Sequence, residues 1–270
     1  MKKKLITLFF LLLAILTANF FLWNNSDRIF FVTLLAFAVF VIFIFMRFLN
    51  ELVLERLKEM NKNLNMAFGQ IQSLLFIYKK IDFNKALPQM RGSAISPDFA
   101  SILIFLYEER KPVNIVECGS GVSTILLSYL VKGTDAKILS LDHLKKFADI
   151  TAQNLREHKS GNNVKVLFSD LKEYKIKDRL YNWYDLDKVK NMPSNIDMLI
   201  IDGPPRNLNK NVRYPALALL YDRLAENCVI ILDDADRKDE KEVVKRWLME
   251  FPEFKKTYIP TEKGTVILER

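Results

Sequence analysis

Two long apolar runs open the sequence, and neither shows the polar and apolar alternation of a soluble helix or strand. Residues 5–23 contain no charged side chain, and residues 29–49 contain one, Arg47, near their end. Each run is long enough to cross the hydrocarbon core of a bilayer as a helix, and the polar segment 24–28 between them is enough for a turn. The pattern therefore predicts a transmembrane helical hairpin over residues 1–49.

Basic residues lie on the outer sides of both runs. Three lysines at positions 2–4 precede the first run, Arg47 lies at the end of the second run and Arg56 after it, and Arg28 in the turn is offset by Asp27. Because cytoplasmic flanks carry the excess of Lys and Arg, we expect both ends of the hairpin, and the catalytic domain, on the cytoplasmic side of an inner membrane. A cleaved signal peptide followed by one span is the alternative, but the first run is long for a signal and lacks a good cleavage site.

Residues 50–95 are predicted to form an amphipathic helical linker or stalk. Apolar side chains alternate three and four positions apart over about three heptads. They are Leu57, Met60, Leu64, Ala67, Ile71, Leu74 and Tyr78. This stripe either packs on the chain's own domain or joins two copies, so a homo-oligomer formed through the helix 57–78 is one expectation. Gly69 weakens that second alternative.

From Ser96 onward, short apolar runs rich in β-branched residues alternate with amphipathic segments. Strands are predicted at 114–118, 137–141, 164–168, 197–201, 228–232, 256–259 and 265–268, and helices at 96–109, 123–130, 144–158, 214–225 and 238–251. This alternation predicts one α/β domain, residues 96–270, with a Rossmann-like, doubly wound, mostly parallel seven-stranded sheet. The last two strands are joined by a short turn, so these two strands should pair antiparallel at the sheet edge. We expect residues 169–196 to be irregular.

Charge and composition argue against two classes of function. The formal net charge of +8 divides evenly, because residues 1–49 hold five basic and one acidic side chain and the rest holds 35 basic and 31 acidic ones. No Lys- or Arg-rich block with interleaved aromatic residues is present, so nucleic-acid binding is not indicated. Cys118 and Cys228 lie in apolar runs, and the only histidines are His143 and His158. A structural zinc site is therefore not expected.

A glycine-rich turn follows the first predicted strand of this domain. The strand runs into Glu117, Gly119, Ser120 and Gly121 and then into a helix. Glycine lets the backbone turn sharply and approach a ligand, and the start of the helix presents free amide groups. This segment is a candidate cofactor-binding loop.

Acidic residues end the second and third predicted strands. Asp142 can accept hydrogen bonds from both ribose hydroxyls of a nucleoside, and Asp170 can accept one from an adenine amino group. His143 follows the ribose acid and is expected to pack beside the cofactor. A dinucleotide is disfavoured, because Thr124 stands at the third glycine position of GxGxxG and Glu117 would repel a pyrophosphate. These charges suit a cationic nucleoside that carries an amino acid.

The chain from residue 96 onward resembles the class I S-adenosylmethionine-dependent methyltransferases. The resemblance rests on residues 117–121, Asp142, Asp170, Asp202 and the closing hairpin, and the segments RGSAISPDF, ECGSGVST, IDGPP, RYPAL and LDDADR are similar to a bacterial subgroup. The resemblance implies S-adenosyl-L-methionine as the cofactor. It places the glycines of residues 117–121 under the methionine part, the glutamate of the same segment near the ammonium group, Asp142 at the ribose and Asp170 at the adenine.

A second set of acids is expected where the fourth and fifth strands end, which is where an open α/β sheet binds its second ligand. Asp202 ends one strand, and Asp233 and Asp234 end the next. Three carboxylates in one cleft suit Mg²⁺ or Mn²⁺. Catechol-type O-methyltransferases carry metal ligands at these strand ends, but there the second pair is Asp-Asn. The alternatives are that one acid is a general base, or that Asp234 or Asp236 caps the following helix.

Arginines flank this predicted cleft. Arg206, Arg213 and Arg237 could bind a phosphate or carboxylate through the guanidinium fork. The catalytic candidates are Asp202, Asp234 and Arg213.

The predicted function is methyl transfer from S-adenosylmethionine to an oxygen of a polar, glycosylated or phosphorylated acceptor, either a small molecule or a lipid-linked one, near the membrane. A non-catalytic nucleoside-binding or scaffold membrane protein is a rival, and the acids present in both halves of the cleft argue against it. An NAD-dependent oxidoreductase is opposed by Thr124 and Glu117.

Overall fold

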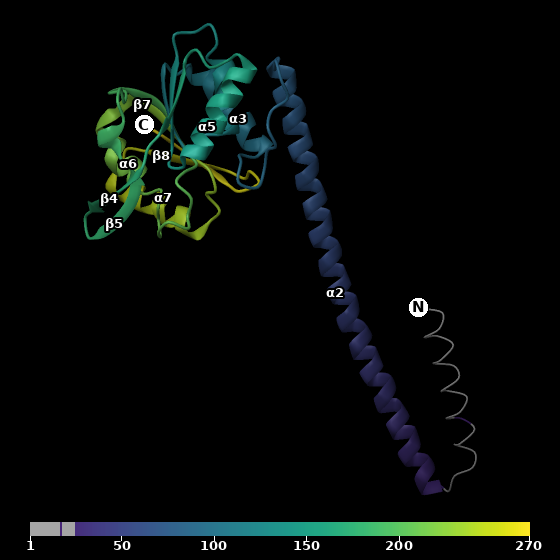
Figure 1. The fold of residues 1–270 in the computed structure, drawn as a ribbon. Coiled ribbons are helices and arrows are strands. Elements are labelled where there is room, and N and C mark those ends of the chain that lie inside the picture. Colours follow the sequence, from purple (N-terminus) through teal and green to yellow (C-terminus); the bar gives the residue numbers. More distant parts are fainter. Residues whose placement is uncertain (1–16, 18–24) are drawn as a thin grey trace. The chain divides into compact units, whose positions relative to one another are not determined.

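The structure is a computed structural model that describes residue 17 and residues 25–270, in two compact units, Met1–Asn65 and Met66–Arg270 (Figure 1). Each unit is described by itself. The first predicted membrane span, residues 5–23, lies outside the described residues apart from Thr17.

A single helix, α2 (Asn25–Lys80), joins the second predicted span to the predicted stalk. It is unbroken because no glycine or proline occurs between Asn25 and Phe68. The described part of the predicted turn at 24–28 is helical from Asn25 onward. Among the described residues, α2 is the one helix long and apolar enough, over Phe31–Lys80, to cross a membrane.

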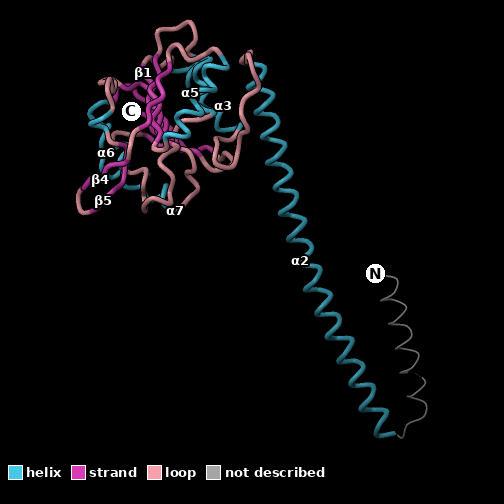
Figure 2. The backbone as a smooth tube through the Cα atoms, viewed as in Figure 1, coloured by secondary structure: helices cyan, strands magenta, loops and turns pink. Residues whose placement is uncertain are grey.

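The C-terminal unit contains a seven-stranded sheet, whose strands are magenta in Figure 2. The strand order is β3-β2-β1-β6-β7-β9-β8. The strands are β1 (Asn114–Cys118), β2 (Lys137–Asp142), β3 (Val164–Phe168), β6 (Ile196–Ile201), β7 (Leu224–Leu232), β8 (Lys255–Ile259) and β9 (Thr265–Glu269). β3, β2, β1, β6 and β7 pair in parallel, whereas β9 pairs antiparallel with both β7 and β8. The predicted Rossmann-like α/β sheet with an antiparallel closing strand is confirmed.

Helices cover both faces of this sheet, as a doubly wound fold requires. They are α3 (Pro97–Arg110), α4 (Val122–Leu130), α5 (Lys145–His158), α6 (Pro215–Leu220) and α7 (Lys238–Glu250). Ile115 and Ile200 of the sheet pack in one buried cluster with side chains of α3 and α4. Val116 and Leu199, which point the opposite way, pack in a second cluster with α6 and α7.

The segment 169–196, predicted to be irregular, instead contains an antiparallel hairpin. It consists of β4 (Leu171–Ile176) and β5 (Arg179–Tyr184), which form a separate two-stranded sheet. Tyr181 and Trp183 alternate along β5 and are buried against the main sheet. The expectation was wrong because this alternation is carried by only two side chains in a polar segment.

The boundary between α6 and β7 also differs from the prediction of a helix through residue 225. α6 ends at Leu220, a 3-10 turn covers Tyr221–Arg223, and β7 begins at Leu224. Leu224 pairs with Ile196 ahead of an irregularity in the β6–β7 register. Tertiary strand pairing has overridden local helix propensity at this point.

The last turns of α2 belong to the C-terminal unit and dock on α3. Ile77 and Ile81 are buried in the same cluster as Phe99. The Gln70 amide donates to the Asp98 carboxylate at 2.7 Å and accepts from the Asp98 backbone N–H at 3.2 Å.

Candidate functional site

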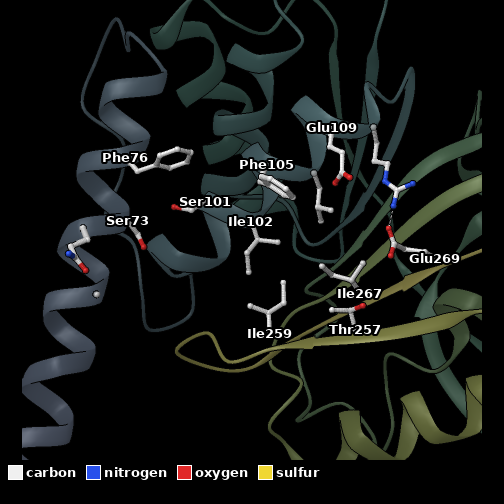
Figure 3. A pocket seen from close by; sticks show the side chains of 14 residues that line it. Ser73, Phe76, Ser101, Ile102, Phe105, Glu109, Thr257, Ile259, Ile267 and Glu269 are labelled. Carbon is white, nitrogen blue, oxygen red and sulfur yellow. Dashed lines mark hydrogen bonds and ion pairs between the residues drawn. The ribbon is translucent and has the colours of Figure 1, made fainter.

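Two cavities of the C-terminal unit differ in their chemistry. One, of about 640 Å³, lies between the end of α2, α3 and the β8–β9 edge (Figure 3). Its wall is formed largely by Phe76, Ile102, Phe105, Ile259 and Ile267, and it contains none of the predicted site residues.

The other cavity, of about 530 Å³, lies where the parallel strands end. Its size is that of ordinary small-molecule sites. It gathers most of the predicted site residues in its lining, namely Gly119, Ser120, Gly121, Asp142, His143, Asp202, Arg213 and Asp234, with Arg206 and Arg237. Glu117, Asp170 and Asp233 do not line it.

The glycine-rich turn is held tightly against the neighbouring strand end. Gly119 has φ +104°, and a Cβ there would lie 3.0 Å from the backbone nitrogen of Gly203. A Cβ at Gly121 would meet nothing within 4 Å, because this glycine faces the cavity. Gly119 is thus required by the fold, whereas Gly121 leaves room for a ligand.

This difference predicts a contrast between two substitutions. Gly119→Ala is expected to lower the free energy of unfolding by about 1–3 kcal/mol, through backbone strain and overpacking. Gly121→Ala should change it by less than about 0.5 kcal/mol and should act on ligand binding alone. Denaturant unfolding of both variants checks this; equal destabilisation by the two would contradict the placement of Gly121 beside open space.

Glu117 is fully buried beneath the turn. It accepts hydrogen bonds from Thr124 Oγ1 at 2.5 Å and Ser140 Oγ at 2.6 Å, while its Oε1 has no partner among the described residues. Burial raises the pKa of Glu117 to about 7. Thr124 occupies the position of the third glycine in a GxGxxG dinucleotide-binding loop, and here its hydroxyl holds the Glu117 carboxylate by a hydrogen bond. An unpartnered buried carboxylate oxygen is costly unless a cation or donor reaches it.

Asp142 lies at the cavity wall with its carboxylate already oriented. Its Oδ2 accepts from Ser120 Oγ at 2.7 Å and its Oδ1 from the Leu144 N–H at 2.9 Å. Burial lowers the pKa of the adjacent His143 imidazole. Each oxygen of the Asp142 carboxylate thus accepts one hydrogen bond from the chain, and the side chain lines the cavity.

Asp170 is placed differently from the other predicted cofactor ligands. Its side chain is 59% exposed and lies 3.7 Å from Lys188. The structure therefore does not bring it to the cavity that holds Asp142.

Arg213 ties together the acids at the ends of β6 and β7. It is buried, and its Nη2 donates to Asp202 Oδ1 at 3.1 Å and to Asp234 Oδ2 at 2.7 Å, while Nη1 donates to the Asp233 carbonyl at 2.7 Å. It also donates to the Asp202 carbonyl. Asp234 adopts φ +59°, which is rare for a non-glycine residue and is often found at functional sites.

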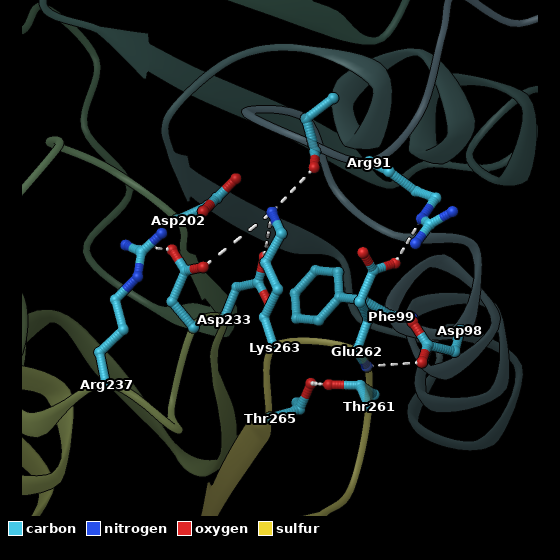
Figure 4. Close-up of polar contacts among 12 residues, drawn as sticks. Arg91, Asp98, Phe99, Asp202, Asp233, Arg237, Thr261, Glu262, Lys263 and Thr265 are labelled. Atoms are coloured by element: carbon cyan, nitrogen blue, oxygen red, sulfur yellow. Dashed lines mark hydrogen bonds and ion pairs between the residues drawn. The ribbon is translucent and has the colours of Figure 1, made fainter. Parts of the chain in front are cut away.

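Two further cations complete the charge balance of this cluster. Arg237 Nη1 lies 2.6 Å from Asp234, and Lys263 Nζ lies 3.8 Å from Asp233 and donates to the Ala94 carbonyl at 2.9 Å (Figure 4). With Arg213, three cations face Asp202, Asp233, Asp234 and the buried Glu240. One protonated carboxyl would make the cluster neutral.

The titration of the acids agrees with this balance. Burial raises the pKa of Asp233 to about 7, and its acidic neighbours add to the shift. Burial also raises the pKa of Asp202, against the opposing charge of Arg213. Asp233 does not line the cavity, whereas Asp202 does. Asp234 also lines the cavity, but it is 2% exposed and paired with both Arg213 and Arg237. Asp202 is therefore the more accessible of the two acids in the lining.

The predicted metal site does not fit this arrangement. One oxygen from each of Asp202, Asp233 and Asp234 lies within 4.8 Å of the others. However, Arg213 already bridges Asp202 and Asp234, and a divalent cation in the cluster would lie against its guanidinium. No catalytic step is therefore derived through a metal.

Residues 116–235, which include the glycine-rich turn and both strand-end acid groups, match the family model of a methyltransferase domain. The chain carries a methyltransferase domain. The predicted enzyme class is confirmed. No curated protein sequence matches the chain significantly.

Solved structures show the same fold as this methyltransferase domain. An O-methyltransferase from Bacillus cereus in complex with SAH is 18% identical with a TM-score of 0.51, over 74% of this chain and 89% of that one. A methyltransferase from Podospora anserina, bound to SAH, is 18% identical with a TM-score of 0.50, over 74% of this chain and 86% of that one.

Several residues that line the cavity of the methyltransferase domain were not among the predicted ones. They are chiefly residues 88–89 and 92–95, Leu144, Phe147 and Ile150 of the α5 region, Tyr184 and Lys263. The Tyr184 hydroxyl is fully buried without a partner among the described residues, and a Cβ at Gly203 would lie 2.5 Å from it. Of these residues, only those within the motif RGSAIS were indicated by the sequence. Tyr184 and Lys263 were not, because the β4–β5 hairpin and the β8–β9 turn bring them to the site.

Proposed function

We propose that the chain transfers a methyl group from S-adenosylmethionine to an oxygen of a polar acceptor close to a membrane. The observation that carries this proposal is one cavity whose wall holds the glycine-rich turn and Asp142 on one side and Asp202, with its raised pKa, on the other. The first set suits a nucleoside and the second suits removal of a proton.

The cofactor half of the cavity would hold S-adenosylmethionine as follows. Gly119 and Gly121 pass beneath the methionine part, with Glu117 near its ammonium group, and Asp142 binds the ribose hydroxyls beside His143. The exposed apolar side chains of Leu144, Phe147 and Ile150 line the same cavity and would pack on the adenine base. Asp170 is left out of this proposal, because its side chain is exposed beside Lys188, whereas Glu117 is buried beneath the glycine-rich turn that lines the cavity.

Transfer requires an in-line approach of the acceptor oxygen to the methyl carbon. The Asp202 carboxylate takes the acceptor's proton, the oxygen forms the new bond to carbon, and the carbon–sulfur bond breaks so that S-adenosylhomocysteine leaves neutral at sulfur. Arg213 acts as a positioning residue that keeps Asp202 and Asp234 in place, and most of the acceleration comes from orientation of the two reactants.

The acceptor side is bounded by basic residues. Arg206 is exposed at this cavity, and Arg237 and Lys263 lie deeper in its lining. These side chains support an acceptor with phosphate or glycosyl oxygens, free or lipid-linked. Mass spectrometry of membrane lipids and polar metabolites tests this choice of acceptor. Cells that contain the protein should hold a species heavier by one CH₂ group than its counterpart in cells without the protein. The absence of such a species would contradict the proposal.

The apolar part of α2 supports attachment to a membrane. Its length and composition suffice for a span. With the basic residues at both outer flanks, we expect a reporter at Asn25 to be extracytoplasmic and one at Arg270 to be cytoplasmic. Accessibility labelling in intact cells checks this, with a reporter in the polar loop 207–210 as the control that should match Arg270. Labelling of Asn25 and Arg270 from the same side would rule out the hairpin topology.

A further inference from the structure

The C-terminal part of α2 exposes an apolar row that the domain leaves largely uncovered. Tyr78, at the end of the row, contacts the Phe83 ring and accepts a hydrogen bond from the Leu87 N–H. Gln70 and Ile77 mark the face that docks on α3. On another face, the side chains spaced by three and four positions remain 48–67% exposed; they are Phe68, Ile71, Leu75 and Tyr78. Exposed large apolar side chains gathered in one row indicate an interaction surface.

The row follows the heptad spacing of a coiled coil. In sequence it continues toward the N-terminus through Leu64, Asn61 and Leu57. Leu57, Leu64, Ile71 and Tyr78 then occupy the d positions, and Asn61, Phe68 and Leu75 the a positions. The stripe expected from sequence placed Ala67 and Leu74 in it, but both are partly covered by the domain. The free row uses their neighbours Phe68 and Leu75. Gly69 faces the apolar cavity and does not interrupt it.

Two features favour an identical helix as the partner. Residues 63–78 contain no charged side chain, so contact of like with like meets no repulsion. Asn61 occupies an a position, where a buried polar residue can pair with its own copy and fixes a parallel, in-register arrangement.

The surface is also large enough. Four exposed side chains and the flanking Leu64 present on the order of 500 Å² per copy, so two copies would bury roughly 1,000 Å², which is the lower range of specific interfaces. Copies held in one membrane by the same helix would also be parallel, a point that rests on the proposed membrane attachment.

We propose that α2 forms a parallel two-stranded coiled coil with a second copy of this chain through Phe68, Ile71, Leu75 and Tyr78. The surface is distinct from the cofactor cavity, so its test does not depend on methyl transfer.

Cysteine cross-linking of the full chain in membranes tests the register. Leu75→Cys places its thiol in the seam, where two copies approach within disulfide range. Phe76→Cys is the control, because Phe76 lies on a different face of α2 at the wall of the apolar cavity, with 36% of the residue exposed. Cys118 and Cys228 are buried, and burial raises the pKa of both thiols, so they should stay unreactive. Mild oxidation should give a covalent dimer with Leu75→Cys and at least tenfold less with Phe76→Cys. No dimer at position 75, or equal dimer at both positions, would overturn the proposal.

A second measurement tests the proposal even if one of the cysteine variants misfolds. The detergent-solubilised full chain should have the mass of a dimer by light scattering, and the double variant Ile71→Asp, Leu75→Asp the mass of a monomer. Its affinity for S-adenosylhomocysteine should match that of the wild type, because neither residue lines the cofactor cavity. A monomeric wild type, or a double variant that remains dimeric, would contradict the assignment of this face.

Discussion

Replacing Asp202 by asparagine is expected to lower the methyl-transfer rate by roughly 10²–10⁴-fold, the range for loss of a general base. Asparagine keeps the shape and an acceptor for the 3.1 Å bond from Arg213, but it cannot take a proton. Release of S-adenosylhomocysteine, with extracted membranes and metabolites as the acceptor source, measures the rate. A variant that retains the wild-type rate would remove Asp202 as the base.

The pH profile separates a base from a structural acid. A base acts in its ionised form, so activity should be lost as the pH falls through the pKa of Asp202 in the folded protein. Burial raises that pKa, so the loss begins above the usual range of an aspartate. The Asp202→Asn variant should not show this loss of activity at low pH. Asp236→Asn is the matched control, since this exposed acid lies outside the cavity and its replacement should leave the rate and the pH profile unchanged.

A chelator should not change the wild-type rate. Loss of activity that Mg²⁺ restores would contradict the charge balance supplied by Arg213.

Removal of the Asp142 carboxylate is expected to weaken S-adenosylmethionine binding by about 1.5–3 kcal/mol, or roughly 10- to 150-fold, as for hydrogen bonds to a charged group. Asp142 is held by Ser120 and the Leu144 N–H with its side chain at the cavity. Calorimetry on Asp142→Ala measures the loss. Asp170→Ala is the control and should bind as the wild type does, because Asp170 is exposed and outside the cavity. A loss with Asp170→Ala but none with Asp142→Ala would reverse the two assignments.

Sequence patterns were enough to predict the strands of the central sheet. β1 and β3 have the predicted bounds for different reasons. β1 is buried at the centre of the sheet, whereas β3 lies at the sheet edge, where none of its five residues is buried and polar Lys165 is exposed. The end of α6 could not be placed in this way. Leu224 and Ala225 suit a helix locally, and only their position beside β6 makes them part of β7. The β4–β5 hairpin was missed for a related reason, since its support comes from Tyr181 and Trp183 packing on distant side chains.

The site was predictable where its residues follow strands in the sequence. Asp142 is the last residue of β2 and Asp202 directly follows β6, so parallel strand order brings them to one edge of the sheet. Asp170 follows β3 by the same logic, but the chain turns into β4 there and leaves its side chain exposed. The role of Arg213 as the bridge between two acids, and of Lys263 as the third cation, depends on tertiary distances that no local pattern records.

Equilibrium binding of S-adenosylmethionine and of nicotinamide dinucleotides to the purified full chain tests the central claim most directly. The cavity, with Glu117 beneath its glycine-rich turn and Asp142 at its wall, predicts saturable one-to-one binding of S-adenosylmethionine and S-adenosylhomocysteine and none of NAD or NADP. Binding of a dinucleotide, or of neither class of nucleoside by a folded wild-type protein, would contradict it.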